Sequence, residues 1–270
     1  MKRNTTAPPV VLTIAGCDPS GGAGIIADLK TFTTLGCWAT AALTSLTFQN
    51  TQGVFGARHQ TAATVRAQIV PVVQDFTIAA VKTGMLPTRA IIRTVARLCR
   101  ELALPAPVVD PVVRSTSGYD LLDDAALRAL MQDLLPLARI ITPNLPEAER
   151  MTGLHIRDEA GLLRAAHALR DLGARAVLVK GGHLPRRAEQ PEAVDVLVEE
   201  DGATTILRGA WIESRDTHGT GCTLAAALAA YLAHGADLLT ATRRAKAFVA
   251  VAIRQAPGLG HGHRPVQHTH

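Results

Sequence analysis

The amino-acid sequence predicts one α/β domain whose central sheet is mostly parallel. Short apolar, β-branched runs alternate with longer segments of helical periodicity along most of its 270 residues. Hydrophobic residues make up 47% of the chain and aromatic residues only 3%. The core must therefore consist of Ala, Leu, Val and Ile, which suits helices packed on a parallel sheet better than a β-sandwich.

The first half of the chain is expected to alternate strands with helices. Thr61 and Pro87 stand at predicted helix starts, where a capping hydroxyl and a proline are favoured. Asp110 lies at the end of a short predicted strand. Strands are expected at 10–15, 39–48, 78–82 and 107–111, and helices at 23–35, 61–76, 87–102 and 123–135.

The second half continues this pattern and then changes. In 158–172 the leucines and alanines fall on one stripe, which is typical of an amphipathic helix. Residues 193–199 and 204–207, joined by Asp201-Gly202, are expected to form an antiparallel hairpin at one edge of the sheet. The remaining expected elements are strands at 139–142 and 176–180 and helices at 145–151, 221–234 and 237–255.

Composition bounds the organisation and the possible partners. No linker rich in Pro, Gly or Ser divides 10–270, which we expect to be a single domain after a flexible N-terminal segment, 1–9. That segment lacks the apolar stretch of a signal peptide, and no run reaches the roughly 18 apolar residues of a membrane span. Four cysteines without a CxxC pair favour the reducing cytoplasm. The net charge of +5 comes from scattered residues, which argues against nucleic-acid binding and favours small anionic substrates.

The most informative motif is a glycine-rich turn, Gly219-Thr220-Gly221-Cys222, that opens a small-residue apolar helix. Free backbone N–H groups at the positive end of a helix dipole form an anion site. The same field is expected to lower the pKa of the Cys222 thiol, which would make it a candidate proton acceptor. The alternative is a buried, inert cysteine. The combination suggests phosphoryl transfer to a small alcohol.

Other polar residues follow predicted strands, where ligands gather in open α/β sheets. Asn144 and Glu147 are candidates both for a helix capping box and, through water, for a Mg²⁺ site, and the two roles are not exclusive. Asp110 is either a metal-facing carboxylate or a turn residue, and Lys180 with Gly182 either binds a phosphate or forms a turn. The sequence contains no Walker A motif, no protein-kinase signature and no GxGxxG spacing.

With these motifs assembled, the chain closely resembles the hydroxymethylpyrimidine/phosphomethylpyrimidine kinases of the ribokinase superfamily. The resemblance implies a ribokinase-like three-layer αβα sandwich, ATP with Mg²⁺, a monovalent cation as a further candidate cofactor, and a homodimer. It also implies that 4-amino-5-hydroxymethyl-2-methylpyrimidine is phosphorylated to its monophosphate and then to its diphosphate for thiamine biosynthesis. The matching segments include Gly16-Cys17-Asp18-Pro19-Ser20-Gly21-Gly22-Ala23-Gly24, Gln49-Asn50-Thr51, Gly84-Met85-Leu86, Thr142-Pro143-Asn144-Leu145-Pro146-Glu147, Lys180-Gly181-Gly182-His183 and Thr217-His218-Gly219-Thr220-Gly221-Cys222-Thr223.

The resemblance also implies roles for individual residues. Gln49 would pair with the aminopyrimidine edge, and its carboxamide suits this because it offers both a donor and an acceptor. Cys222 would be the base, beside an anion hole formed by Gly219, Thr220 and Gly221, with Lys180 as a further catalytic group. The substrate pocket would be lined by Gly16, Ala23, Asp28, Met85 and Val112, the nucleotide side by Asn144, Glu147, Lys180, Gly182 and Thr217, and the metal by Asp110 and Glu147.

The chain departs from the family pattern at two places. Thr116 stands where some members carry a phosphate-binding lysine, with Arg114 as a displaced substitute, and Arg264 stands where glycine is common. Pyridoxal kinase, alone or as a second activity, is the nearest alternative function, and a non-catalytic sensor is a more distant one. Residues 52–60 and 184–191 are candidate lids, since water must be kept from the transferred phosphoryl group.

Overall fold

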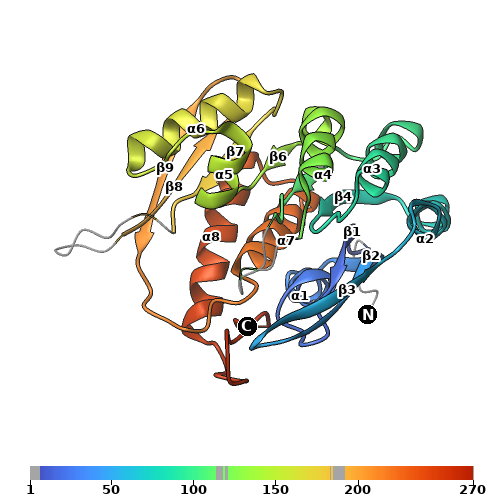
Figure 1. The fold of residues 1–270 in the computed structure, drawn as a ribbon, viewed down its shortest axis with the longest axis horizontal. Coiled ribbons are helices and arrows are strands. Elements are labelled where there is room, and N and C mark those ends of the chain that lie inside the picture. The colour runs from blue at the N-terminus through green and yellow to red at the C-terminus, as the bar shows by residue number, and fades with distance from the viewer. Residues whose placement is uncertain (1–6, 114–117, 119–120, 183, 185–191, 270) are drawn as a thin grey trace, which may run out of the picture.

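The computed structural model describes residues 7–113, 118, 121–182, 184 and 192–269 (Figure 1). Within this part of the chain one sheet has the strand order β3-β2-β1-β4-β5-β6-β7-β8-β9. The strands are β1 Val10–Cys17, β2 Trp38–Asn50, β3 Gly53–His59, β4 Ile78–Thr83, β5 Val108–Val109, β6 Ile140–Ile141, β7 Val177–Lys180, β8 Glu192–Val198 and β9 Thr204–Ala210.

Most helices connect successive strands, as the alternating pattern predicts. Side chains of Thr61, Thr88, Asp123, Asp158 and Asp237 cap five of them by accepting a backbone N–H. The helices are α1 Gly24–Thr34, α2 Ala62–Asp75, α3 Arg89–Glu101, α4 Asp124–Ala129, which continues as a π turn Leu130–Leu134 and a 3₁₀ turn Leu135–Leu137, α5 Leu145–Thr152, α6 Glu159–Asp171, α7 Thr220–Ala233 and α8 Leu238–Arg254.

Strands β2, β1, β4, β5, β6 and β7 run parallel to one another, whereas β3 pairs with β2, β8 with β7 and β9 with β8 in antiparallel fashion. This confirms the mostly parallel sheet and the hairpin at one edge. The second antiparallel edge, formed by β3, was not predicted from the sequence. Residues 52–60, expected as a lid, mostly form β3, because the turn after Asn50 returns the chain along β2 from Gly53 to His59. Of the second candidate lid, 184–191, only Leu184 lies within the described residues.

Two apolar layers cover the two faces of the sheet and make the three-layer arrangement (Figure 1). Leu12 and Ile14 of β1 point toward the layer that includes α2, α3, α4 and α6, whereas Val11 points toward the layer built on α7. Successive side chains of a strand point to opposite faces of the sheet, so this alternation is expected for a strand that is buried on both faces. The α7 layer is packed from alanines, so that α7 lies close against the centre of the sheet.

No helix in the described part of the chain combines the length and hydropathy needed to cross a lipid bilayer.

Candidate active site

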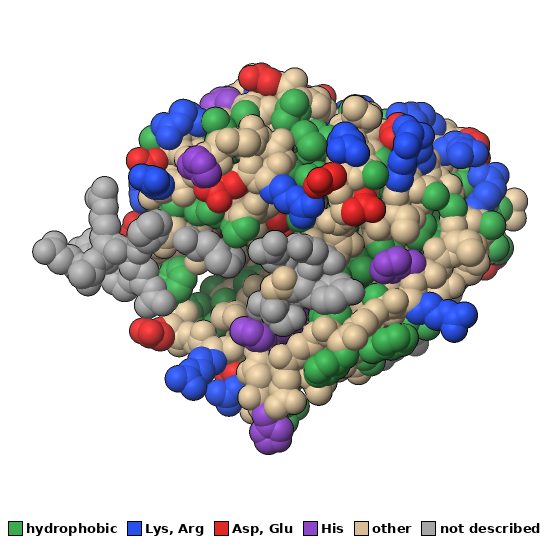
Figure 2. All heavy atoms as spheres, in the orientation of Figure 1, with side chains coloured by type: hydrophobic (Ala, Val, Ile, Leu, Met, Phe, Trp, Pro, Cys, Tyr) green, Lys and Arg blue, Asp and Glu red, His purple; other side chains and the backbone are tan. Residues whose placement is uncertain are grey.

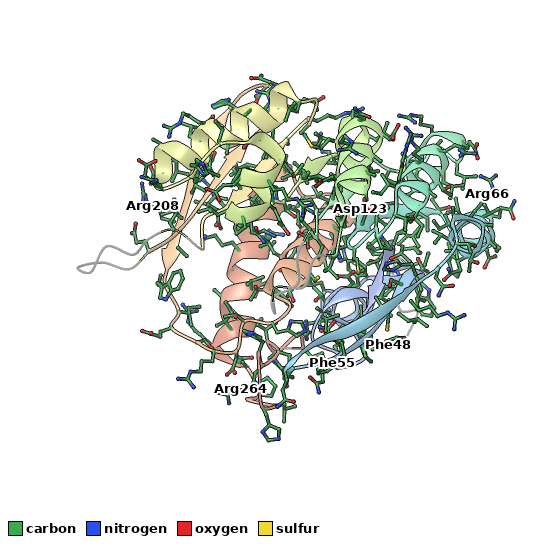
Figure 3. All side chains as sticks on the ribbon, viewed as in Figure 1. Phe48, Phe55, Arg66, Asp123, Arg208 and Arg264 are labelled. Atoms are coloured by element: carbon green, nitrogen blue, oxygen red, sulfur yellow. The ribbon has the colours of Figure 1, made fainter. Side chains whose placement is uncertain are left out.

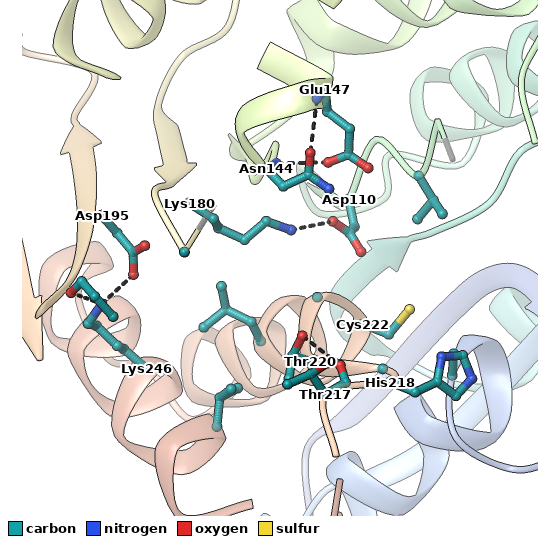
Figure 4. A pocket seen from close by; sticks show the side chains of 18 of the residues that line it. Asp110, Asn144, Glu147, Lys180, Asp195, Thr217, His218, Thr220, Cys222 and Lys246 are labelled. Carbon is teal, nitrogen blue, oxygen red and sulfur yellow. Dashed lines mark hydrogen bonds and ion pairs between the residues drawn. The ribbon is translucent and has the colours of Figure 1, made fainter. Parts of the chain in front are cut away.

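Four polar side chains stand at the carboxyl ends of neighbouring parallel strands, on one face of the sheet. They are Lys82 in β4, Asp110 after β5, Thr142 after β6 and Lys180 at the end of β7. Because side chains two positions apart share a face, each continues a column of the α7 core. The preceding members of those columns, all in the α7 layer, are Ala80, Val108, Ile140 and Leu178. The polar ends of the columns therefore gather opposite the amino end of α7 (Figure 4).

Helix α7 begins at Thr220 after Gly219, whose φ of 86° is left-handed. A side chain at Gly219 would collide with the Gly22 carbonyl oxygen, so the position requires glycine. Gly221 lies against the charged groups, because a Cβ built there would be 3.3 Å from Lys180 Nζ and 3.7 Å from Asp110 Oδ2. The anion turn predicted from the sequence thus opens directly onto the strand ends, and its N–H groups and the lysine face the same space.

Asp110 and Lys180 form an ion pair at the centre of the site. Lys180 Nζ lies 3.2 Å from Asp110 Oδ1, which also accepts a hydrogen bond from Thr142 Oγ1 at 3.2 Å. Burial alone would lower the pKa of Lys180, but the Asp110 and Glu147 carboxylates outweigh it and raise that pKa. The lysine therefore carries its charge at neutral pH and presents it to the cavity.

Asn144 and Glu147 form the predicted capping box at the start of α5. Asn144 Oδ1 accepts from the Glu147 N–H at 2.9 Å, and Glu147 Oε2 accepts from the Asn144 N–H at 2.8 Å. Burial raises the pKa of Glu147 to about 7, with Lys180 opposing the shift and Asp110 adding to it. Two carboxylates that repel one another in this way suit a divalent cation, and no larger cluster of metal-binding side chains occurs in the described residues. Mg²⁺ usually has only one or two protein ligands where phosphates and water complete its coordination shell.

Cys222 lies in the first turn of α7, but its thiol is not the activated group that the sequence analysis expected. Burial raises the pKa of Cys222 to about 11, outweighing the lowering by the Lys82 ammonium and by the Gly24 N–H. The expectation of a lowered pKa was wrong because the removal of water outweighs the favourable charges. The thiol is therefore protonated at neutral pH.

Beneath the site lies a second lysine–aspartate pair, which the sequence analysis did not identify. Lys82 Nζ is 2.8 Å from Asp28 Oδ2, and both side chains are 0% exposed. Thr13 Oγ1 donates to the same carboxylate at 2.6 Å. Burial would lower the pKa of Lys82, but Asp28 outweighs it and raises that pKa. Asp28 does not line the cavity with the other predicted substrate residues, whereas Lys82 does.

The remaining predicted site residues line one cavity of about 1550 Å³, which Figure 2 shows as a hollow with apolar side chains at its base. A Cβ built at Gly16 would lie 3.0 Å from Met85 Sδ, so these two residues close one wall together. The cavity lining includes the substrate-side residues Gly16, Ala23, Gln49, Met85 and Val112 and the nucleotide-side residues Asp110, Asn144, Glu147, Lys180, Gly182, Thr217, Gly219, Thr220, Gly221 and Cys222. Arg114 and Thr116 lie outside the described residues.

The carboxyl-terminal segment packs beside the anion turn. Arg264, where the family often has glycine, places its Nε 2.8 Å from Asp216 Oδ1, just before the turn. The His263 N–H donates to the Thr51 carbonyl oxygen at 2.6 Å, in the β2–β3 turn. His218 was not predicted as a site residue either, and its Nε2 lies 2.7 Å from Asp18 Oδ2. Its place inside the Thr217–Thr223 motif was the available signal.

Comparison with known proteins agrees with this geometry. Residues 18–267 match the family described as phosphomethylpyrimidine kinase. A hydroxymethylpyrimidine/phosphomethylpyrimidine kinase of Rhizobium meliloti is 47% identical over 264 residues, 97% of each chain. The thiamine biosynthesis bifunctional protein of Geobacter sulfurreducens is 47% identical over 259 residues, and this chain spans about half of its length, 52%.

Among solved structures, the ADP complex of Bacillus subtilis pyridoxal kinase superposes with a TM-score of 0.87 at 36% identity, covering 97% of this chain and 98% of that one. The fold is therefore that of the ribokinase-like vitamin kinases, as the sequence predicted. Since the family match covers most of the residues, including both sides of the cavity, the chain belongs to the phosphomethylpyrimidine kinase family.

Proposed function

We propose that this protein phosphorylates 4-amino-5-hydroxymethyl-2-methylpyrimidine with ATP, first to the monophosphate and then to the diphosphate, in thiamine biosynthesis. The observation that carries the proposal is the single cavity that holds all three parts of such a reaction. The anion turn and Cys222 face the charged wall with Lys180 (Figure 4), and Gln49 lines the same cavity together with the apolar substrate-side residues. The relatives named for the same two steps support the choice of substrate.

In this mechanism the N–H groups of Gly219 and Gly221 and the Lys180 ammonium stabilise the charge on the transferring phosphoryl group. In the first step the hydroxymethyl oxygen bonds to the γ-phosphorus, the bond from that phosphorus to ADP breaks, and the hydroxyl loses its proton. The Cys222 sulfur accepts that proton in the small fraction of molecules that hold it as a thiolate, because burial keeps most of the thiol protonated and the Lys82 ammonium opposes this only in part. Because the transition state of phosphoryl transfer is loose, neutralising the phosphoryl charge contributes more to the rate than the base does.

The second step needs no base. Its nucleophile is an oxygen of the monophosphate, whose second pKa is about 6, so it is already ionised at neutral pH. A mostly protonated Cys222 is compatible with this step. We propose that Asp110 and Glu147 hold Mg²⁺ together with the nucleotide phosphates, where the ion would neutralise phosphate charge.

The direct test is ³¹P NMR of the protein with MgATP and hydroxymethylpyrimidine, followed over time. We expect a monophosphate signal that rises and then converts to diphosphate. A monophosphate that accumulates without conversion, with faster turnover of pyridoxal, would instead support pyridoxal kinase, the activity of the Bacillus subtilis neighbour. No ADP with either substrate would contradict both kinases and favour a sensor.

We further propose a cytoplasmic homodimer. Four free cysteines fit a reducing compartment. Strands β2 and β3 expose an apolar group, of which Phe48 is 56% and Phe55 70% exposed (Figure 3). This surface, at the edge opposite the 193–207 hairpin, supports a contact between copies. We expect light scattering to give a dimer for the native protein and a monomer for Phe48→Ser/Phe55→Ser. A monomeric native protein would contradict this part of the proposal.

A further inference from the structure

Asp18 is a fully used hydrogen-bond acceptor beside the substrate wall. Its Oδ1 accepts from the Ser20 N–H at 2.8 Å and from Ser20 Oγ at 2.7 Å, and its Oδ2 accepts from the Ala23 N–H at 3.0 Å. Burial opposes ionisation, but the hydrogen bonds from His218 and Ser20 hold the pKa of Asp18 below its ordinary value. The carboxylate is therefore ionised and can only accept. It follows that His218 Nε2, 2.7 Å away, carries a hydrogen and donates it to Asp18.

His218 is also held rigidly. Its N–H donates to the Arg264 carbonyl oxygen at 3.0 Å, and its own carbonyl oxygen accepts from the Val266 N–H at 3.3 Å. A side chain at Gly22 would collide with the imidazole ring, so the chain passes directly over it. The residue is 6% exposed. Backbone and carboxylate together fix both the position of the ring and the atom that carries the hydrogen.

Gln49, the residue proposed to recognise the aminopyrimidine, lies against this fixed donor. Gln49 Nε2 is 3.4 Å from His218 Nε2, and Gln49 Oε1 is 3.1 Å from Thr47 Oγ1, which also donates to the Cys17 carbonyl oxygen at 2.9 Å. In this arrangement two N–H donors face each other, and one hydroxyl hydrogen must serve two acceptors. A half-turn of the carboxamide removes both conflicts. The carbonyl oxygen then faces the Nε2–H edge of His218 as a second, longer acceptor of the hydrogen that His218 donates to Asp18. The NH₂ group donates to Thr47, whose hydrogen remains with Cys17.

We propose that His218 is a positioning residue that, through Asp18, fixes the Gln49 carboxamide with its oxygen toward the anion turn and its NH₂ group toward Thr47. The inference rests on the proposed function, since it concerns Gln49 as the partner of the pyrimidine. The free lone pair of the oxygen then accepts from the exocyclic amine, and the second N–H donates to the adjacent ring nitrogen. Pyridoxal presents a hydroxyl group next to a ring carbon in place of an amine next to a ring nitrogen. It can therefore pair with only one of the two Gln49 groups, the oxygen or the N–H. The fixed carboxamide therefore selects an aminopyrimidine over pyridoxal.

The test is a double-mutant cycle between His218→Ala and Gln49→Ala, measured as KM and kcat for hydroxymethylpyrimidine, pyridoxal and ATP. We expect His218→Ala to raise the KM for hydroxymethylpyrimidine roughly tenfold, to change kcat and the KM for ATP by less than about threefold, and to reduce the preference over pyridoxal by roughly tenfold. In the Gln49→Ala background His218→Ala should add little, because the group that it positions is already absent.

Two further variants keep the result interpretable. His218→Gln, which can place an N–H near the position of Nε2, should recover most of the lost affinity, and the exposed His167→Ala serves as a matched control. If His218→Ala does not fold, His218→Phe removes the donor while filling the space. Multiplicative effects of the two mutations, or an equal fall in kcat with both substrates, would overturn the inference. A native protein that does not phosphorylate hydroxymethylpyrimidine would instead reject the proposed function itself.

Discussion

Two lysine–aspartate pairs stand on the same face of the sheet, and both lysines line the cavity, but of the two aspartates only Asp110 lines it. Lys82 and Asp28 are both 0% exposed and are 2.8 Å apart. Lys180 and Asp110 are 15% and 4% exposed and are 3.2 Å apart. Lys180 ends β7 and Lys82 is the last residue but one of β4, each after a run of apolar residues, so local sequence alone does not distinguish them. What distinguishes them is the partner, since Asp28 comes from the middle of α1 and covers its lysine, whereas Asp110 follows the end of β5, two strands away from β7 in the sheet.

We call Lys82–Asp28 the closed pair and Lys180–Asp110 the open pair. The difference indicates that the closed pair contributes to the electrostatic potential of the site, whereas the open pair binds phosphate groups. In a pair that is already fully desolvated, each charge is compensated only by its partner. Removing one member therefore leaves an uncompensated buried charge. A lysine open to the cavity can exchange part of its interaction with Asp110 for one with a phosphate. Mutations should therefore affect stability at one pair and catalysis at the other.

The largest effect is expected for Lys180→Met. Without its ammonium the transferring phosphoryl group loses its cationic contact, and we expect kcat/KM to fall roughly 10³–10⁴-fold. The melting temperature should change much less than for the loss of Lys82. Steady-state kinetics with calorimetry check both, and a variant with near-native kcat/KM would contradict a binding role for the open pair.

At the closed pair, Lys82→Met should destabilise the protein by about 3–5 kcal/mol, because it leaves Asp28 buried and unpaired. The double variant Asp28→Asn/Lys82→Met removes the stranded charge and should recover a large part of this loss. Urea unfolding of the single and double variants measures the difference. A double variant less stable than the single one would show that Asp28 is not destabilised by losing its partner.

Glu147, which faces the open pair, should make stability depend on pH. Its folded pKa of about 7 lies above the ordinary value of 4.5, so the folded state binds the proton more tightly. The resulting stabilisation is complete below the ordinary pKa and is lost as the pH rises through 7, by on the order of 3 kcal/mol. Glu147→Gln keeps the cap and should remove this slope. Equal slopes for native and variant protein would contradict the raised pKa.

The smallest effect separates the two phosphorylation steps. Cys222→Ala should slow the first step roughly 10–100-fold, since general base catalysis is worth about that much or more, and leave the second within about threefold. The first step of the native enzyme should also accelerate as the pH rises toward the thiol pKa of about 11, and the variant should not. Quenched-flow assays started separately from hydroxymethylpyrimidine and from its monophosphate give both rates. Equal slowing of the two steps would make Cys222 a shape-determining residue and not a base.

Much of the fold and of the site followed from the sequence, because strand ends, glycine turns and caps are local. The anion turn at Gly219 and the box of Asn144 and Glu147 were of this kind. Other features depend on distant contacts. His218 meets Asp18 across 200 residues of sequence, and β3 was missed because its pairing follows from a turn that looked like an irregular segment. Asp28 was expected in the pocket, but its helix turns it toward β4, where it meets Lys82.

The Cys222 prediction failed for another reason. The sequence showed a helix start and therefore a favourable field, but it could not show how far the protein around the cavity removes water from the half-buried thiol. Desolvation and field act in opposite directions, and only the packed structure decides which is larger.

The most direct measurement of the difference between the two pairs is the rise in melting temperature on adding ATP, compared between the native protein, Lys180→Met and Asp28→Asn/Lys82→Met. A ligand that binds only the folded state stabilises it by RT ln(1 + L/Kd), where L is the free ligand concentration, so the rise in melting temperature reports the affinity for ATP. We predict that the rise is retained by the double variant at the closed pair and is lost or strongly reduced in Lys180→Met. A normal rise in Lys180→Met together with its loss in the double variant would contradict the assignment of binding to the open pair.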